Sequence, residues 1–232
     1  MDVILIPGLW LDAASWGEVM PALRDVGLNP RPLTMPGLGT PASESSGIGI
    51  ADWVTAAVTA IDTAEGPVVV VGHSGGGNVA WGAADARPDR VARVILVDTA
   101  VPADGGIISE FEKVDGVIPF PGWDFFDDEE VADLDAATRA ATAPRTRSVP
   151  ARVPTDPIAL RDERRYRVPV TVLSGQLEDD AFRGSLAQWE RSATEFTAIE
   201  STEIVKLDSG HWPQFSQPAR LAAAIVAAIR RP

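Results

Sequence analysis

The chain has 232 residues, 45% hydrophobic and 23% charged, which is typical of a globular protein with one sizeable core. Its 20 lysines and arginines against 33 aspartates and glutamates give a net charge of −13, which argues against nucleic acid and anionic membrane surfaces as partners. The absence of cysteine excludes disulfides, thiolate nucleophiles and cysteine-ligated metals.

The chain opens with a short apolar run, residues 3–6, which ends at Pro7 and Gly8 and predicts a buried strand. No basic region precedes this run, as one would in a signal peptide. No apolar run approaches the ~20 residues that a membrane helix needs. We therefore expect a cytoplasmic protein.

The first hundred residues alternate between apolar runs and amphipathic stretches. Strands are predicted over 3–6, 29–33, 67–71 and 91–97, and helices over 16–23, 52–64 and 75–86. The valine-rich runs carry no polar alternation, which is typical of strands buried on both faces. The strand-helix order favours an α/β fold with a mostly parallel sheet of about six strands and helices on both faces.

The alternation stops between residues 103 and 166 and then returns. This stretch holds a glycine pair, an aromatic run, an acidic run and several prolines, and it is partly helical around 129–141. Beyond it, strands are predicted over 168–173 and 203–207, and helices over 185–193 and 218–229. We expect a core made of 1–102 and 167–232, with 103–166 as an insertion.

The sharpest motif is Gly-His-Ser-Gly-Gly, residues 72–76, between a predicted strand and a predicted helix. In that context Gly-x-Ser-x-Gly forms a tight turn that exposes the serine hydroxyl above the sheet. The residue after the serine offers its N–H at a helix start, where negative charge is stabilised. Ser74 is therefore the candidate nucleophile.

A serine nucleophile needs a base, and the chain has only two histidines, His73 and His211. His73 lies inside the turn, where its side chain should point away from Ser74, so a packing or hydrogen-bonding role is expected. His211 lies between the last predicted strand and the last helix. That loop opens at the same sheet edge as Ser74, which makes His211 the candidate general base.

These motifs together resemble the α/β-hydrolase superfamily, in the branch of plant-type esterases and hydroxynitrile lyases. The matching segments span nearly the whole chain: 6–10, 36–39, 72–76 and 210–212. The resemblance implies an oxyanion hole made by the N–H groups of Gly75 and Leu9, although Pro7-Gly8 stands where His-Gly is usual. It also implies that the insertion 103–166 forms a lid or cap.

The carboxylate that should orient His211 has two candidates. Asp98 follows the strand predicted over 91–97, and some superfamily members carry their acid there. Glu178 stands where the superfamily usually has Asp after the next strand, and its neighbours Asp179 and Asp180 could serve if that loop shifts. Asp208 is too near His211 in sequence. The sequence leaves Asp98 and Glu178 open.

The resulting expectation is a serine hydrolase that cleaves a small, partly apolar carboxylic ester or lactone through an acyl-enzyme on Ser74. Trp123, Phe125 and Phe126 either line the pocket or dock the lid. No metal or organic cofactor is expected, and the only expected partner is the small-molecule ester; the oligomeric state stays open.

Two alternatives remain. The first is a hydroxynitrile-lyase-like protein, or a secondary-metabolite lyase or cyclase, with the same residues. The superfamily's hydroxynitrile lyases normally add a lysine near the site, and this chain offers only Lys113 and Lys206. The second is a non-catalytic small-molecule binding protein.

Overall fold

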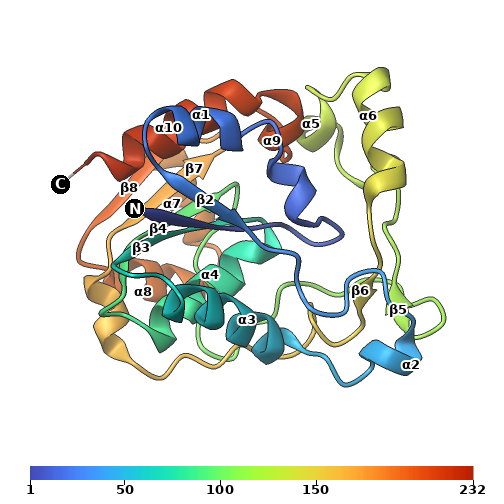
Figure 1. Ribbon diagram of the computed structural model, residues 1–232, viewed down its shortest axis with the longest axis horizontal. Coiled ribbons are helices and arrows are strands. Elements are labelled where there is room, and N and C mark those ends of the chain that lie inside the picture. Colours follow the sequence, from blue (N-terminus) through green and yellow to red (C-terminus); the bar gives the residue numbers. More distant parts are fainter. Residues whose placement is uncertain (232) are drawn as a thin grey trace.

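Residues 1–231 are described in the computed structural model, and a six-stranded sheet lies at its centre (Figure 1). Its strands run in the order β2 (Asn29–Pro32), β1 (Asp2–Ile6), β3 (Val68–His73), β4 (Val91–Val97), β7 (Val170–Ser174) and β8 (Thr202–Lys206). All five pairings are parallel. The expected parallel sheet of about six strands is confirmed.

Helices cover both faces of the sheet, as Figure 1 shows. One face carries α3 (Ile50–Asp62), α4 (Gly75–Ala86) and α8 (Glu190–Ala198). The other carries η1 (Ala13–Trp16), α1 (Met20–Asp25) and α10 (Pro218–Ile229). Within residues 1–231, no helix combines the length and the apolar character needed to cross a membrane.

Alternate residues of each central strand enter two separate cores, which is why the strands are apolar throughout. In β1, Ile4 and Ile6 pack in the layer of α3 and α4. Val3 and Leu5 pack instead in the layer of α1 and α10. All four side chains are fully buried. The sheet is therefore held from both sides, which gives the loops at its carboxyl edge a rigid base.

The segment 103–166 contributes no strand to the main sheet. It holds η2 (Trp123–Phe125), α5 (Asp128–Val131), α6 (Ala136–Thr142), η3 (Ala143–Arg145), a short antiparallel pair β5 (Val117–Ile118) and β6 (Val149–Pro150), and most of η4 (Glu163–Arg167). The helical stretch expected around 129–141 is thus present as two short helices. Figure 1 places α5, α6, β5 and β6 along one side of the molecule.

The helix predicted over 185–193 is wrong in its bounds. The structure has α7 (Asp179–Leu186) and α8 instead, with a break at 187–189. Phe196 of α8 is buried, Phe182 of α7 is partly buried, and their rings meet at 5.9 Å between centroids. Glu178, Asp179 and Asp180 stand at the start of α7, where the helix dipole favours negative side chains. The short helices α2 (Ala42–Ser45) and α9 (Pro213–Ser216) carry too few residues for a periodic signal.

Candidate active site

Ser74 stands at a tight turn between β3 and α4, with φ 50° and ψ −126°. A side chain at Gly72 would collide with the backbone of Gly76, and one at Gly76 with the carbonyl of Pro7. The turn therefore needs both glycines, and it leaves Ser74 in a strained conformation that L-residues rarely adopt.

Backbone strain is concentrated at the carboxyl edge of the sheet. Trp10 after β1 (φ 64°), Ser74 after β3 and Asp98 after β4 (φ 49°) all have positive φ. Only Asp115 and Asp208 share this property among the other non-glycine residues of 1–231. Strain of this kind persists where the surrounding structure enforces it, and it commonly marks functional sites.

The register of the strands brings Ser74 beside Asp98. His73 of β3 pairs with Val97 of β4, so the next residue of each strand lies side by side. The Ser74 N–H donates to the Val97 carbonyl at 3.0 Å. Two residues 24 positions apart in the chain are thus neighbours because two parallel strands end together.

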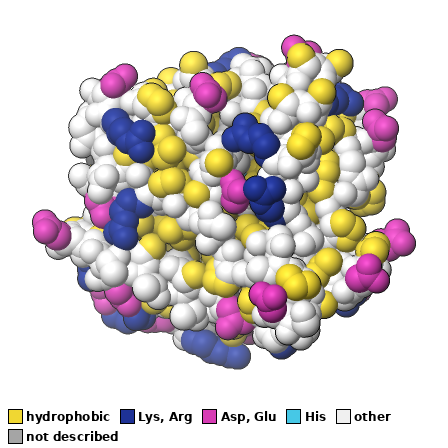
Figure 2. Space-filling view, turned by 45° about the vertical axis from the view of Figure 1, so that its right-hand side comes forward, with side chains coloured by type: hydrophobic (Ala, Val, Ile, Leu, Met, Phe, Trp, Pro, Cys, Tyr) yellow, Lys and Arg dark blue, Asp and Glu magenta, His cyan; other side chains and the backbone are white. Residues whose placement is uncertain are grey.

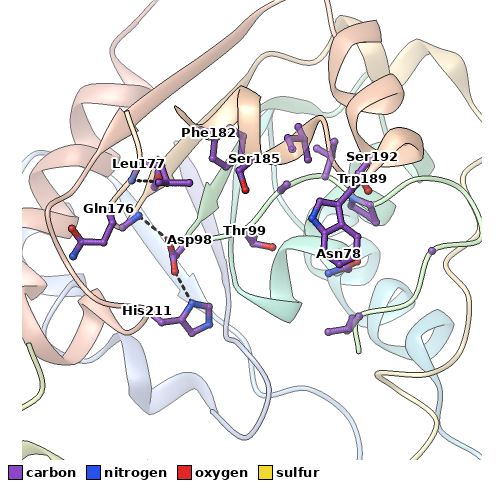
Figure 3. Close-up of a pocket in the computed structure, with 18 of the residues that line it drawn as sticks. Asn78, Asp98, Thr99, Gln176, Leu177, Phe182, Ser185, Trp189, Ser192 and His211 are labelled. Carbon is purple, nitrogen blue, oxygen red and sulfur yellow. Dashed lines mark hydrogen bonds and ion pairs between the residues drawn. The ribbon is translucent and has the colours of Figure 1, made fainter. Parts of the chain in front are cut away.

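Asp98 is the hydrogen-bond partner of His211. The His211 Nδ1–H donates to Asp98 Oδ2 at 2.6 Å, and the Gly175 N–H donates to Asp98 Oδ1 at 2.8 Å (Figure 3). Burial acts to raise the pKa of Asp98, but these hydrogen bonds and the electrostatic attraction of His211 outweigh it and hold the pKa below its usual range. Asp98 thus stays ionised, and Nε2 of His211 is left free as an acceptor.

Glu178 does not reach His211. Its side chain is 77% exposed at the start of α7, and its nearest cation is Lys206 at 3.9 Å. Asp179 pairs instead with Arg183 in the next turn of the same helix at 2.6 Å. Asp208 pairs with Lys206 and Arg220. Of the carboxylates considered from the sequence, the structure brings only Asp98 to the histidine.

His73 is buried below His211 and supports its backbone. Its Nε2–H donates to the His211 carbonyl at 2.7 Å, and Gln214 Nε2 lies 3.3 Å from His73 Nδ1. Burial, with repulsion from His211 as a smaller cause, lowers the pKa of His73 to about 3. The neutral ring donates from Nε2 and accepts at Nδ1, which fixes the amide orientation of Gln214.

This burial predicts a specific pH dependence of stability. The pKa of His73 is about 3 in the folded state against 6.5 for the free side chain, so below pH 6.5 the unfolded chain takes up a proton that the folded chain does not. The free energy of unfolding should therefore fall as pH drops from 6.5 towards 3, by about 2 kcal/mol at pH 5. Urea unfolding of wild type and His73→Gln at pH 7.5 and 5 measures this change in the free energy of unfolding. Equal pH slopes for both proteins would contradict the assignment.

Ser74 and His211 line one cavity of about 310 Å³. Leu9 and Gly75 line it as well, and within residues 1–231 the N–H of neither has a hydrogen-bond acceptor. A methyl group at Gly75 would approach the Leu9 side chain to 3.1 Å, so the two residues are in contact. The Ser74 hydroxyl makes no hydrogen bond to another described residue, including His211, and such bonds often tighten only when substrate binds.

Aromatic side chains form much of the wall of this cavity. Trp10, Phe111, Phe125, Phe126 and Trp212 line it. Trp123 does not: its ring packs on Trp212 at 5.0 Å between centroids, and its Nε1–H donates to a carbonyl of α6. The aromatic run of the insertion therefore divides, with two rings facing the cavity and one holding the insertion in place.

The insertion also holds the histidine loop. The N–H of His211 donates to the Glu130 carbonyl at 2.8 Å, and the N–H of Gly210 to Asp133 Oδ2 at 2.8 Å. Sequence reasoning missed Asp133, Gln214 and Gly175. They act through contacts across the fold, and no local motif marks them. Whether 103–166 moves as a lid stays a prediction.

Figure 2 views a face that brings the insertion side forward. Hydrophobic side chains show between charged ones, and acidic side chains stand mostly along the outline. Within residues 1–231, no three histidine, aspartate or glutamate side chains gather as metal ligands would. The groups gathered at the cavity are a hydroxyl, an imidazole with its carboxylate, and two free backbone N–H donors, the set used in acyl transfer.

A strained serine, a histidine and an aspartate at the carboxyl edge of a parallel sheet define an α/β protein of hydrolase type. The model of the alpha/beta hydrolase family matches residues 3–224, so the chain belongs to this family and the resemblance seen in the sequence is confirmed. A curated relative, the lipase LipV of Mycobacterium tuberculosis, is 49% identical over 76 residues. These are 33% of this chain and only 27% of LipV.

Solved structures share the fold over the full length. An extracellular α/β-hydrolase from a Paenibacillus species has a TM-score of 0.79 and 19% identity, with all of both chains covered. A methylesterase from Arabidopsis has a TM-score of 0.75 and 17% identity, and the match covers 99% of this chain and 98% of the methylesterase. A pyrethroid hydrolase from Sphingobium faniae has a TM-score of 0.72 and 21% identity, and the match covers 100% of this chain and 98% of the pyrethroid hydrolase. At these identities the likeness concerns the fold.

Proposed function

We propose that the protein is a serine hydrolase that cleaves a carboxylic ester or lactone through an acyl-enzyme on Ser74. One observation carries this proposal: Ser74, on its strained turn, and His211, hydrogen-bonded to Asp98, line the same cavity. Membership of the hydrolase family and the local likeness to a lipase support it.

In the first step Ser74 attacks the ester carbonyl while Nε2 of His211 takes the hydroxyl proton. Asp98 holds the Nδ1 proton and stabilises the imidazolium that forms. The N–H groups of Leu9 and Gly75 receive the oxyanion, and each such donor contributes about 3 kcal/mol. His211 then returns the proton to the leaving alcohol, and water activated by the same histidine releases the acid.

The aromatic wall of the cavity supports a small, partly apolar acyl group. The lyase alternative is weakened, because neither Lys113 nor Lys206 lines this cavity or the larger one beside it. Lys206 is engaged with Asp208 at 2.9 Å. No reaction step of the proposed mechanism calls for a metal or an organic cofactor.

A fluorophosphonate probe and p-nitrophenyl butyrate test the proposal together. We expect one covalent adduct per chain, located on Ser74 by peptide mass spectrometry, and Ser74-dependent release of p-nitrophenol. Denatured protein is the control for non-specific labelling. Absence of both adduct and turnover, together with retained binding of a small ligand, would indicate a binding protein instead.

A further inference from the structure

A second cleft adjoins the Ser74 cavity and is not used by the mechanism above. It has a volume of about 910 Å³ and lies between the loop after β4 and helices α7 and α8 (Figure 3). Both cavities are lined by Asn78, Asp98, Thr99, Ile108, Glu130 and His211, so they meet at these residues. Ser74, Leu9 and Gly75 line only the smaller one.

This division assigns the two halves of an ester. The carbonyl carbon must lie at Ser74 with its oxygen at the N–H groups of Leu9 and Gly75, which places the acyl part in the smaller cavity. The leaving oxygen must reach His211, because it takes the proton that His211 removed from Ser74 as the C–O bond breaks. His211 also borders the larger cleft. The alcohol part therefore extends from His211 into that cleft.

The walls of the cleft are largely apolar. Ile107, Leu177 and Trp189 lie on it, and they are 44%, 38% and 70% exposed. Large exposed apolar side chains gathered around one hollow are typical of a binding site for an apolar group. Four carboxylates line the cleft, those of Asp98, Glu129, Glu130 and Glu190, against a single arginine, Arg191, which contacts the Asp104 carbonyl. This balance disfavours an anionic ligand.

Asn78 is a polar side chain where the two cavities meet. It lies one turn after Ser74 on α4, is only 8% exposed, and its side-chain amide has no hydrogen-bond partner within residues 1–231. Its amide is open to the cavities that it lines, so a polar ligand atom can make the hydrogen bonds that water would otherwise make there. In the view of Figure 3, Asn78 lies on the opposite side from Asp98 and His211.

We propose that the larger cleft binds the alcohol part of the ester, that this alcohol is large, mostly apolar and not anionic, and that Asn78 hydrogen-bonds one neutral polar atom of it. The assignment rests on the proposed serine hydrolase function. It makes Asn78 a residue that determines specificity for the alcohol, separate from the aromatic wall that contacts the acyl group.

Ser192→Phe tests the size of the subsite, because Ser192 lines the cleft from α8. We expect kcat/KM for naphthylmethyl butyrate to fall about ten-fold or more, and for ethyl butyrate to change less than about two-fold, since the two esters share one acyl group. Thr194→Phe on the same helix lies outside the cleft and is the matched control. An equal loss for both esters in Ser192→Phe would overturn the assignment.

Asn78→Leu tests the polar contact at nearly constant volume. Butyrates of benzyl alcohols carrying a hydroxymethyl group, at each ring position in turn, are compared with the same esters carrying ethyl. In wild type we expect one position at which hydroxymethyl is preferred about three- to ten-fold, and in Asn78→Leu we expect that preference to vanish. Asn78→Ala is the second variant, and labelling of Ser74 by fluorophosphonate checks that each variant is folded. No preference in wild type, or one retained in both variants, would overturn the role of Asn78.

The two proposals fail differently. If wild type neither labels with fluorophosphonate nor hydrolyses any of these esters, the serine hydrolase function is wrong. If hydrolysis depends on Ser74 but Ser192→Phe leaves the naphthylmethyl ester unaffected, the function stands and the subsite is wrong.

Discussion

Replacing Ser74 with alanine is expected to lower kcat/KM for p-nitrophenyl butyrate by a factor of about 10⁴ or more and to abolish fluorophosphonate labelling. The hydroxyl is the only group removed, and in the proposed mechanism it forms the bond to the acyl carbon. The N–H donors of Leu9 and Gly75 remain, so a residual rate of about 10³ over water is still expected.

The fold should not respond to this change. Ser74 already holds its positive φ because the turn around Gly72 and Gly76 enforces it, and alanine keeps the same Cβ. The thermal midpoint should therefore stay within a few degrees of wild type. Ser43→Ala, on α2 and outside both cavities, is the matched control. Turnover by Ser74→Ala within ten-fold of wild type would refute a covalent mechanism on this residue.

Asp98→Asn is expected to lower kcat/KM by a factor of about 10³–10⁴, while Glu178→Gln changes it less than about two-fold. An amide NH₂ facing His211 would displace the proton from Nδ1 to Nε2, and the ring would then offer no base to Ser74. The amide oxygen can still accept the Gly175 N–H, so the loop after β7 keeps its place. The exposed Glu178 contacts neither Asp98 nor His211; its ion-pair partner is Lys206.

Steady-state kinetics on the two variants separates the candidate acids that the sequence left open. The His211 Nδ1 proton should also shift from the far-downfield NMR position that a short hydrogen bond to Asp98 produces, and only Asp98→Asn should move it. A loss in Glu178→Gln as large as that in Asp98→Asn would contradict the geometry and point to a rearranged loop.

Local patterns were enough to predict the tight turn at Ser74, the place of His211 and the sheet. The valine run before Gly72 and the small helix after Gly76 specify a strand, a tight turn and a helix, because their residues interact within a few positions. His211 followed by elimination, since the one other histidine lies inside the turn. The place of Leu9 was expected from the resemblance to a family, and Leu9 does line the Ser74 cavity. These features depend on short-range geometry.

The helix bounds between residues 179 and 198 were harder to predict from the sequence. The aromatic side chains of α7 and α8 serve two helices that fold back on each other, and a single helical period does not describe them. The aromatic run of the insertion had the same ambiguity: Phe125 and Phe126 face the cavity while Trp123 packs on Trp212. Which ring faces which surface depends on how the insertion docks.

The sequence by itself determined that a serine and a histidine meet above a parallel sheet, because strand, turn and loop each carry a local signal. Only the tertiary structure decided that Asp98, and not Glu178, is hydrogen-bonded to His211. The register of β3 on β4 puts Asp98 beside Ser74, and the loop after β7 adds the Gly175 N–H, whereas Glu178 lies exposed at the start of α7. The tertiary structure alone also forms the larger cleft, since its walls come from segments up to 133 residues apart in the chain. Such contacts depend on chain segments that pack together, and no local pattern encodes them.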